Sequence, residues 1–189
     1  TEPDLYQPAG DQLRLLQALE KDWGLTGLSL DFGVLQSLQD AMRCGDWQLT
    51  VAIRNDNRVV AVWPGFRDQV YGAAVDVGST TIAVHLCDLS SGEVLASAGA
   101  MNPQIRFGED LMSRVSYAML NDEGAEQMTQ VVRKAINDLI AQSAQQAQVE
   151  PADLLELTLV GNPVMHHLLL GLDPRPLGQA PFSLATDQA

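Results

Sequence analysis

The first part of the chain carries two amphipathic helical patterns followed by two short alternating stretches. Apolar residues recur at intervals of three and four over 13–23 and again over 34–42, which predicts two helices. Residues 47–54 and 58–63 alternate between apolar and polar positions around an Asn-Asp-Asn turn, which is typical of a β-hairpin. We therefore expect residues 1–69 to contain a linker and a small α+β module.

From Tyr71 onward the pattern changes to that of a larger α/β domain. Three consecutive strand-like runs are followed by two helical patterns, and a fourth apolar run and a short helix come last. The expected elements are strands at 71–78, 79–89, 94–101 and 154–161 and helices at 109–120, 124–148 and 163–170. Their order is β-β-β-α-α-β-α. The fourth run, LLELTLVG, is apolar enough to predict a buried strand.

Methionines recur on the apolar faces of the two predicted central helices. Met112 and Met119 share one face of the helix at 109–120, and Met128 falls on the apolar face of the next helix. Methionine side chains at such positions are typical of core filling, because the thioether adapts to irregular gaps. We therefore expect all three to pack inside the domain.

The charge of the chain narrows the classes of partner. Eleven basic and 24 acidic side chains give a formal net charge of −13. A nucleic-acid binder needs an excess of positive charge to neutralise phosphates, so nucleic acid is excluded as a partner. The sequence has no charged-then-apolar leader and no run of 18 apolar residues, so we expect no membrane partner and a cytoplasmic location.

Cysteine and histidine, which often hold metals in proteins, are few in this chain. Neither Cys44 nor Cys87 lies in a CxxC or other metal-ligand spacing. The adjacent His166 and His167 project about 100° apart on a helix, so they cannot readily share one ion. A role in the core or at a helix end is therefore favoured over metal ligation for these histidines.

The segment with the most chemical content is the heptapeptide VDVGSTT. A strand delivers Asp76 to the end of the sheet, Gly78 permits a sharp turn, and the hydroxyl residues Ser79, Thr80 and Thr81 follow. A turn of small residues exposes backbone N–H groups that bind phosphate oxygens, and a nearby acid holds Mg²⁺ directly or through water. No GxxxxGK[ST] loop or GxGxxG turn is present. An ordinary hairpin turn is the alternative.

Three segments together resemble a known family. AVDVGSTTIAVHLCDLSSGEVLAS is similar to the first phosphate-binding hairpin of the acetate and sugar kinase/Hsc70/actin superfamily. NPQIRFGEDLMSRV at 102–115 and LVGNPVMHHLLLGLDP at 159–174 resemble the reductive activators of corrinoid-dependent methyltransferase systems. Residues 1–69 are similar to the linker and middle module of those activators. The resemblance implies a small α+β module followed, at 70–189, by the N-terminal part of a ribonuclease H-like domain of the actin/Hsp70/hexokinase type.

The resemblance also implies a function. Activators of this family use ATP to return an inactive Co(II) corrinoid protein to the Co(I) form, with electrons from an iron–sulfur domain. The implied cofactors are ATP and Mg²⁺, with Asp76 as the catalytic, metal-facing acid, and a [2Fe-2S] cluster on an N-terminal domain absent from this chain. The implied partner is a corrinoid protein, and a homodimer is one option for the assembly.

The motifs of the family carry over residue by residue. The phosphate-binding positions would be Gly78, Ser79, Thr80 and Thr81. Gly161 and Asn162 would lie where the fourth strand ends beside the nucleotide cleft. The motif residues to which the resemblance assigns no role are Asn102, Gln104, Gly108, Asp110 and Arg114.

The chain departs from the family in two respects. It has no Cx₄Cx₂C cluster, so we expect no iron–sulfur centre in it. The second phosphate loop and the adenosine-binding segment would lie beyond Ala189, so we expect this chain alone to hydrolyse ATP poorly. Two other interpretations stay open: a small-molecule kinase or other ATP-dependent enzyme of the same superfamily, and a non-catalytic interaction scaffold.

Overall fold

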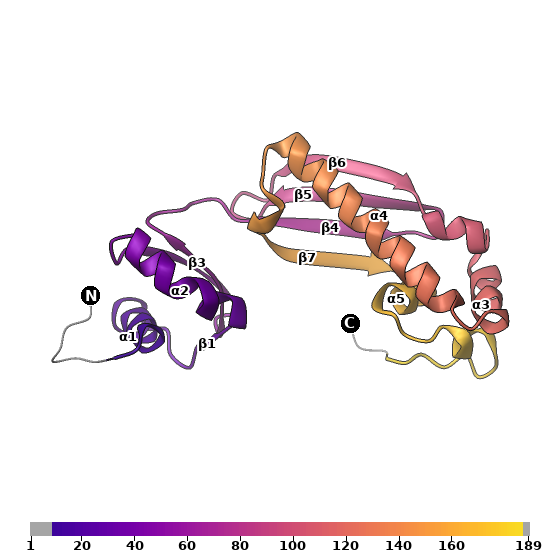
Figure 1. The fold of residues 1–189 in the computed structure, drawn as a ribbon, viewed down its shortest axis with the longest axis horizontal. Coiled ribbons are helices and arrows are strands. Elements are labelled where there is room, and N and C mark those ends of the chain that lie inside the picture. The colour runs from indigo at the N-terminus through magenta and orange to yellow at the C-terminus, as the bar shows by residue number, and fades with distance from the viewer. Residues whose placement is uncertain (1–8, 187–189) are drawn as a thin grey trace. The chain divides into compact units, whose positions relative to one another are not determined.

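The chain folds as two compact units, one ending at Asp68 and the other beginning at Gln69 (Figure 1). The computed structural model describes residues 9–186. Each unit buries its own cluster of apolar side chains. Each therefore has the separate hydrophobic interior that is expected of a domain.

The first unit combines two helices with a three-stranded sheet. Its elements are α1 (Asp11–Trp23), β1 (Ser29–Leu30), α2 (Phe32–Cys44), β2 (Leu49–Arg54) and β3 (Arg58–Pro64). The predicted hairpin is confirmed, because β2 and β3 pair antiparallel and Asn55 and Asp56 have positive φ in the turn. The two-residue strand β1, which the sequence pattern did not reveal, pairs parallel with β3 and completes the order β1-β3-β2.

Both helices of this unit turn an apolar stripe inward. Leu15 and Leu19 of α1 and Val34 and Leu38 of α2 are buried, at the spacing of three or four residues that places side chains on one helix face. α1 ends at Gly24, whose φ of 70° is the left-handed conformation that glycine adopts without a steric cost. The periodicity of the sequence therefore accounts for this core.

The second unit contains the larger domain. Its elements are β4 (Tyr71–Val77), β5 (Thr81–Asp88), β6 (Val94–Met101), the 3₁₀ helix η1 (Pro103–Phe107), α3 (Leu111–Leu120), α4 (Gly124–Ala147), η2 (Pro151–Asp153), β7 (Leu154–Gly161), α5 (Pro163–Leu170) and η3 (Arg175–Gly178). The predicted order of strands and α-helices is confirmed. The short 3₁₀ helices are additions to it.

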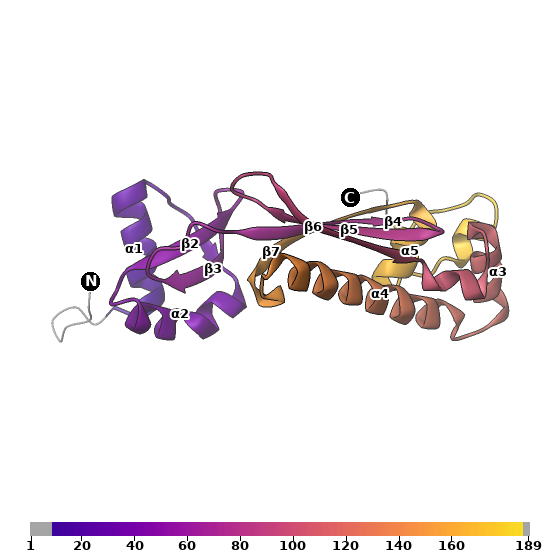
Figure 2. The same cartoon turned by 90° about the horizontal axis from the view of Figure 1, so that it is seen from above.

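The four strands form one sheet in the order β6-β5-β4-β7. β4, β5 and β6 make an antiparallel meander, whereas β7 returns through α3 and α4 to pair parallel with β4. The long helix α4 lies along one face of this sheet (Figures 1 and 2). Side chains alternate across the sheet, so Val75 and Val77 face the core and are each 1% exposed, while Asp76 points to the opposite face and is exposed.

The prediction of a buried fourth strand is wrong. Leu157, Leu159 and Val160 of β7 are 43%, 38% and 58% exposed. β7 stands at the end of the sheet order, so within the described residues β4 is its single strand neighbour. A continuous apolar run is typical of a central strand of a parallel sheet, and the run alone does not reveal that among the described residues β7 is paired on one side only.

The predicted packing face of α3 is also wrong in part. Met112 and Met119 are 50% and 41% exposed, whereas Met128 of α4 is fully buried as expected. The buried side of α3 instead contains Arg114 and Val115, both 0% exposed. A search for apolar positions does not count an arginine as part of the buried face. The face inferred for α3 is therefore centred on the methionines and leaves out Arg114.

The two leucines of α2 provide a matched test of the first core. Leu38 is 2% exposed and Leu35 is 39% exposed. Leu38→Ala removes buried methyl groups and leaves a cavity, so we expect the free energy of unfolding in urea to fall by about 2–5 kcal/mol. Leu35→Ala on the same helix should lower it by less than about 1 kcal/mol. Equal losses would contradict the placement of Leu38 in the core.

Candidate functional site

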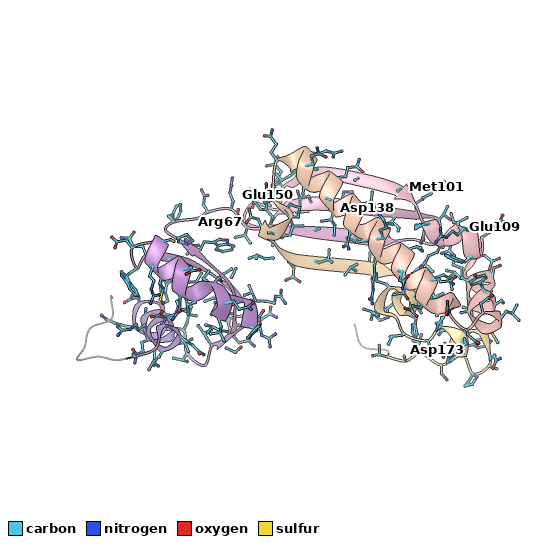
Figure 3. The ribbon with its side chains drawn as sticks, in the orientation of Figure 1. Arg67, Met101, Glu109, Asp138, Glu150 and Asp173 are labelled. Atoms are coloured by element: carbon cyan, nitrogen blue, oxygen red, sulfur yellow. The ribbon has the colours of Figure 1, made fainter. Side chains whose placement is uncertain are left out.

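The ends of β4 and β7 lie side by side because the two strands are parallel neighbours. Val77, the last residue of β4, pairs with Gly161, the last residue of β7. The turn that follows β4 and the segment that begins with Asn162 therefore start at the same edge of the sheet. In Figure 3, Met101 marks this edge, where β6 ends, and Glu150 marks the opposite one.

The three carbonyl groups of the turn between β4 and β5 all accept hydrogen bonds from one later segment. Asn102 donates twice, from Nδ2 to the oxygen of Gly78 and from its backbone N–H to the oxygen of Thr80, at 2.8 Å in each case. Arg114 donates from Nη2 to the oxygen of Ser79. These three consecutive carbonyls are therefore held toward the body of the domain.

The backbone N–H groups of the same turn are unused. Within residues 9–186, those of Gly78, Ser79 and Thr80 have no hydrogen-bond partner in the chain. The C=O and N–H of a trans peptide point in opposite directions, so the inward carbonyls of Gly78 and Ser79 leave the N–H groups of Ser79 and Thr80 facing outward. Successive N–H groups of this kind form an anion-binding concavity. The turn thus has the polarity that phosphate binding requires.

Gly78 is required by close packing within the turn. A Cβ atom at this position would lie 2.6 Å from the carbonyl oxygen of Thr81, which is closer than real Cβ contacts allow. The requirement is therefore steric, and it keeps the turn tight enough for its N–H groups to stand in succession.

Asn102 is buried and uses both ends of its side chain. It is 1% exposed, and besides its donation to Gly78 its Oδ1 accepts from the N–H of Gln104 at 2.9 Å. This second bond caps η1, in which Pro103 occupies the first position and needs no N–H partner. Asn102 therefore links the turn after β4 to the start of η1.

Gln104 ties the same segment to the long helix. Its side chain is fully buried, and its Nε2 donates to the backbone oxygen of Met128 in α4 at 3.0 Å. Its Oε1 accepts from Nη1 of Arg114 at 3.5 Å. The amide thus has a partner at both ends, as a buried polar group needs.

Arg114 is a buried cation at the centre of this network. It is 0% exposed, its Nε donates to the oxygen of Gly108 at 2.9 Å, and its Nη1 also faces Sδ of Met165 at 3.4 Å. Among the described residues no carboxylate lies within ion-pair distance of it. Burial lowers the pKa of the guanidinium below its ordinary value, and the charge of Asp110 opposes that change. The cation is held mainly by neutral acceptors.

Gly108 and Asp110 precede α3 and fix the start of the helix that carries Arg114. A Cβ atom on Gly108 would lie 2.7 Å from the backbone nitrogen of Arg114, so a larger residue there would displace the start of α3. Asp110 caps α3, with Oδ1 accepting from the N–H of Ser113 at 2.8 Å and Oδ2 from its hydroxyl at 2.9 Å. The donated N–H of Ser113 lowers the pKa of the Asp110 carboxyl below its ordinary value.

Gly161 and Asn162 shape the neighbouring strand end. A Cβ atom on Gly161 would lie 3.1 Å from the oxygen of Val77, so glycine lets β7 approach the end of β4. Asn162 caps α5, because its Oδ1 accepts from the N–H of Met165 at 3.0 Å. The sulfur of Met165 in turn accepts a hydrogen bond from Nδ2 of Asn102 at 3.6 Å, so α5 contacts the same network.

Asp76 stands apart from these contacts, on the exposed face of β4. Val77 separates it from the turn, and within the described residues its carboxylate has no hydrogen-bond or ion-pair partner. No group of three or more His, Cys, Asp and Glu residues that could hold a metal is found in that part of the chain. Mg²⁺ commonly binds one or two carboxylates together with phosphates and water. A single acid beside a phosphate site is compatible with this mode of Mg²⁺ coordination.

Comparison with known families decides the relationship. Residues 71–189 match the family model described as the RACo middle region, and residues 1–69 match the RACo linker region. The chain belongs to the RACo family. The resemblance inferred from the three sequence segments is thereby confirmed.

Two relatives of this chain carry functional names. The corrinoid activation enzyme RamQ of Eubacterium limosum is 30% identical over 154 residues, which are 80% of this chain and 26% of RamQ. A solved structure named reductive activator for corrinoid, iron–sulfur protein superposes with a TM-score of 0.82 at 32% identity, over 98% of this chain and 30% of that one. The chain spans about a quarter to a third of these relatives. The second match confirms the fold class: a small α+β module followed by a partial actin/Hsp70/hexokinase-type domain.

Of the two adjacent histidines, His166 and His167, the second is buried and is held by hydrogen bonds to the backbone. His167 is 1% exposed, its Nδ1 lies 2.7 Å from the oxygen of Pro163, and its Nε2 accepts from the N–H of Ala185 at 3.0 Å. Nε2 accepts in this arrangement, so Nδ1 is the nitrogen available to donate to the oxygen of Pro163. The expectation of a core role is confirmed for His167, while His166 is half-buried.

Some parts of the network have no signal in the sequence. Met165 accepts polar donors through its sulfur, although a methionine in an apolar segment reads as core filling. The carbonyl of Met128 is a backbone group that any residue would supply.

None of the helices described for this chain is long and apolar enough to cross a membrane.

Replacement of Asn102 tests the hydrogen-bond network around the turn. Asn102→Ala leaves the part-buried oxygen of Gly78 and the buried N–H of Gln104 without these partners, so we expect the free energy of unfolding in urea to fall by about 1–3 kcal/mol. Asn121→Ala is the control, because Asn121 is exposed and also donates from Nδ2 to a backbone oxygen, that of Tyr117, at 2.9 Å. An equal, small loss in both variants would show that the Asn102 contacts carry no stability.

Proposed function

We propose that this chain supplies the linker and middle regions of an ATP-dependent reductive activator of corrinoid proteins, and that the turn at 78–81 binds phosphate groups of ATP. The observation that carries the proposal is the polarity of the turn: its carbonyls are bonded inward and its N–H groups are unpaired. The domain assignment that goes with it is a linker and small middle α+β module at 1–69, all of which matches the RACo linker region, and the N-terminal part of the ATPase domain at 70–189, where the match is to the RACo middle region.

The names of the relatives support the partner in this proposal. One is called a corrinoid activation enzyme and the other a reductive activator for a corrinoid, iron–sulfur protein. A corrinoid protein is therefore the partner proposed here. The cytoplasmic location and the homodimer stay predictions.

Asp76 is proposed to act through Mg²⁺ in the phosphate site. Its exposed carboxylate is the acidic group nearest in sequence to the turn, and the strand places it on the side of the sheet opposite α4. Mg²⁺ at this position would offset the charge of the phosphates. The side chains of Ser79, Thr80 and Thr81 add hydroxyl donors at the same turn.

The electron source is proposed to lie outside this chain. A [2Fe-2S] cluster takes four protein ligands, usually cysteines, and the sequence contains two cysteines, which fall in different units. In this proposal ATP shifts the balance between two conformations of the activator that differ in affinity for the corrinoid partner. The nucleotide site and the electron donor would then cooperate without sharing residues.

Calorimetric titration with MgATP and MgADP tests the proposal. We expect the full-length protein to bind both nucleotides and the 189-residue chain to bind them more weakly, because the rest of the cleft is proposed to lie in a later segment. Failure of the full-length protein to bind either nucleotide would overturn the phosphate-site assignment. A scaffold role would then become the better hypothesis.

Replacement of the proposed metal-facing acid is a sharper test. Asp76→Asn keeps the shape of the side chain and removes its charge, so in the full-length protein we expect MgATP affinity to fall by about tenfold or more. Asp138→Asn is the control, since Asp138 is exposed on α4 (Figure 3) and pairs with Lys134. Unchanged MgATP binding and corrinoid activation in Asp76→Asn would contradict the role of Asp76.

A further inference from the structure

The position of Arg114 relative to the turn indicates a role that goes beyond packing. We infer that Arg114 is a positioning residue for phosphate binding: it orients and polarises the peptide group between Ser79 and Thr80, so that the N–H of Thr80 becomes the central donor to the phosphate. This inference rests on the function proposed above. Arg114 itself does not contact the ligand in this scheme.

The geometry of one peptide group carries the first step. Nη2 of Arg114 donates to the oxygen of Ser79, and the N–H of the same peptide group belongs to Thr80. Because the peptide is planar and trans, a guanidinium on the oxygen side fixes the N–H on the far side. That N–H has no partner among the described residues, and Thr80 is exposed. The group is therefore aimed outward by a contact made inside the domain.

The charge of Arg114 carries the second step. A hydrogen bond from a cation to a carbonyl is stronger than a neutral one, and in a buried setting it polarises the peptide that accepts it. Among the described residues, the acid whose charge acts on Arg114 is Asp110, and its oxygens are already engaged by Ser113. The buried positive charge thus lacks a direct counter-ion. A phosphate bound to the N–H of Thr80 would lie one peptide group away and would balance it.

The set of acceptors explains why this position needs arginine. The guanidinium reaches Ser79 after β4, Gly108 before α3, Gln104 in η1 and Met165 in α5. A guanidinium presents five donors in a rigid fork, whereas an ammonium group presents three donors from a single point. Lysine can keep the charge near Ser79, but it cannot hold the same acceptors at the same time. The orientation of the turn therefore depends on the fork as well as on the charge.

Three replacements separate charge, donor and bulk in the full-length protein. Arg114→Lys keeps a charge, Arg114→Gln keeps a neutral donor, and Arg114→Met keeps only an apolar chain. We expect MgADP affinity to fall least in the lysine variant, by about tenfold in the glutamine variant, and further in the methionine variant. Arg133→Met is the matched control, because Nε of this exposed arginine donates to the oxygen of Leu169 at 2.7 Å, away from the turn, and its loss should leave affinity unchanged.

A spectroscopic measurement distinguishes positioning from general stability. In the ¹⁵N-labelled 189-residue chain without nucleotide, the amide resonance of Thr80 should shift in Arg114→Gln and remain in place in Arg133→Met, because polarisation of the peptide by Arg114 is lost only in the first. This spectrum decides the matter for any variant that folds. If Arg114→Met does not fold, the lysine and glutamine variants carry the comparison.

The possible outcomes separate this inference from the proposed function. Wild-type protein that binds no nucleotide overturns the proposed function, and the inference falls with it. Wild-type protein that binds MgADP, together with a folded Arg114→Gln variant that binds within twofold of it or has an unshifted Thr80 amide, overturns the inference alone. Weaker binding with a shifted amide supports both.

Discussion

The buried guanidinium of Arg114 is the interaction on which the geometry of this end of the sheet depends. A cation that is removed from water destabilises a fold unless its N–H groups find acceptors. Here the acceptors come from separate segments, among them the turn after β4, Gly108 before α3 and Met165 in α5. Each segment must therefore take one position for the cation to be tolerated. The need to satisfy a single side chain thus defines the shape of the turn.

Two different parts of the chain determine the position and the orientation of the turn. The parallel pairing of β4 and β7 brings Val77 and Gly161 to one edge, which decides where the turn lies. The segment from Asn102 to Arg114 then decides which way the peptide groups of that turn face. In this account the motif whose role the family resemblance left unassigned has a physical task. It binds the carbonyls so that the N–H groups stay available.

The features that the sequence revealed are those that local patterns encode. The hairpin around Asn55 and Asp56, the meander of β4, β5 and β6, and the small-residue turn at Gly78 depend on residues close in sequence, and the structure has them where they were expected. The exposure of β7 depends on strand neighbours, which periodicity does not report. The buried face of α3 and the sulfur acceptor of Met165 depend on Arg114 being inside, which a hydrophobic pattern counts as a surface position.

The proposed function requires that the unpaired N–H groups of the turn receive the phosphate. Amide hydrogen exchange on the full-length protein, followed by mass spectrometry with and without MgADP, tests it most directly, since exchange slows when a free N–H gains an acceptor. We expect protection of the peptide that covers 78–81 and none at the turn between β5 and β6, which lies at the other end of these strands. Nucleotide binding without protection at 78–81 would contradict it.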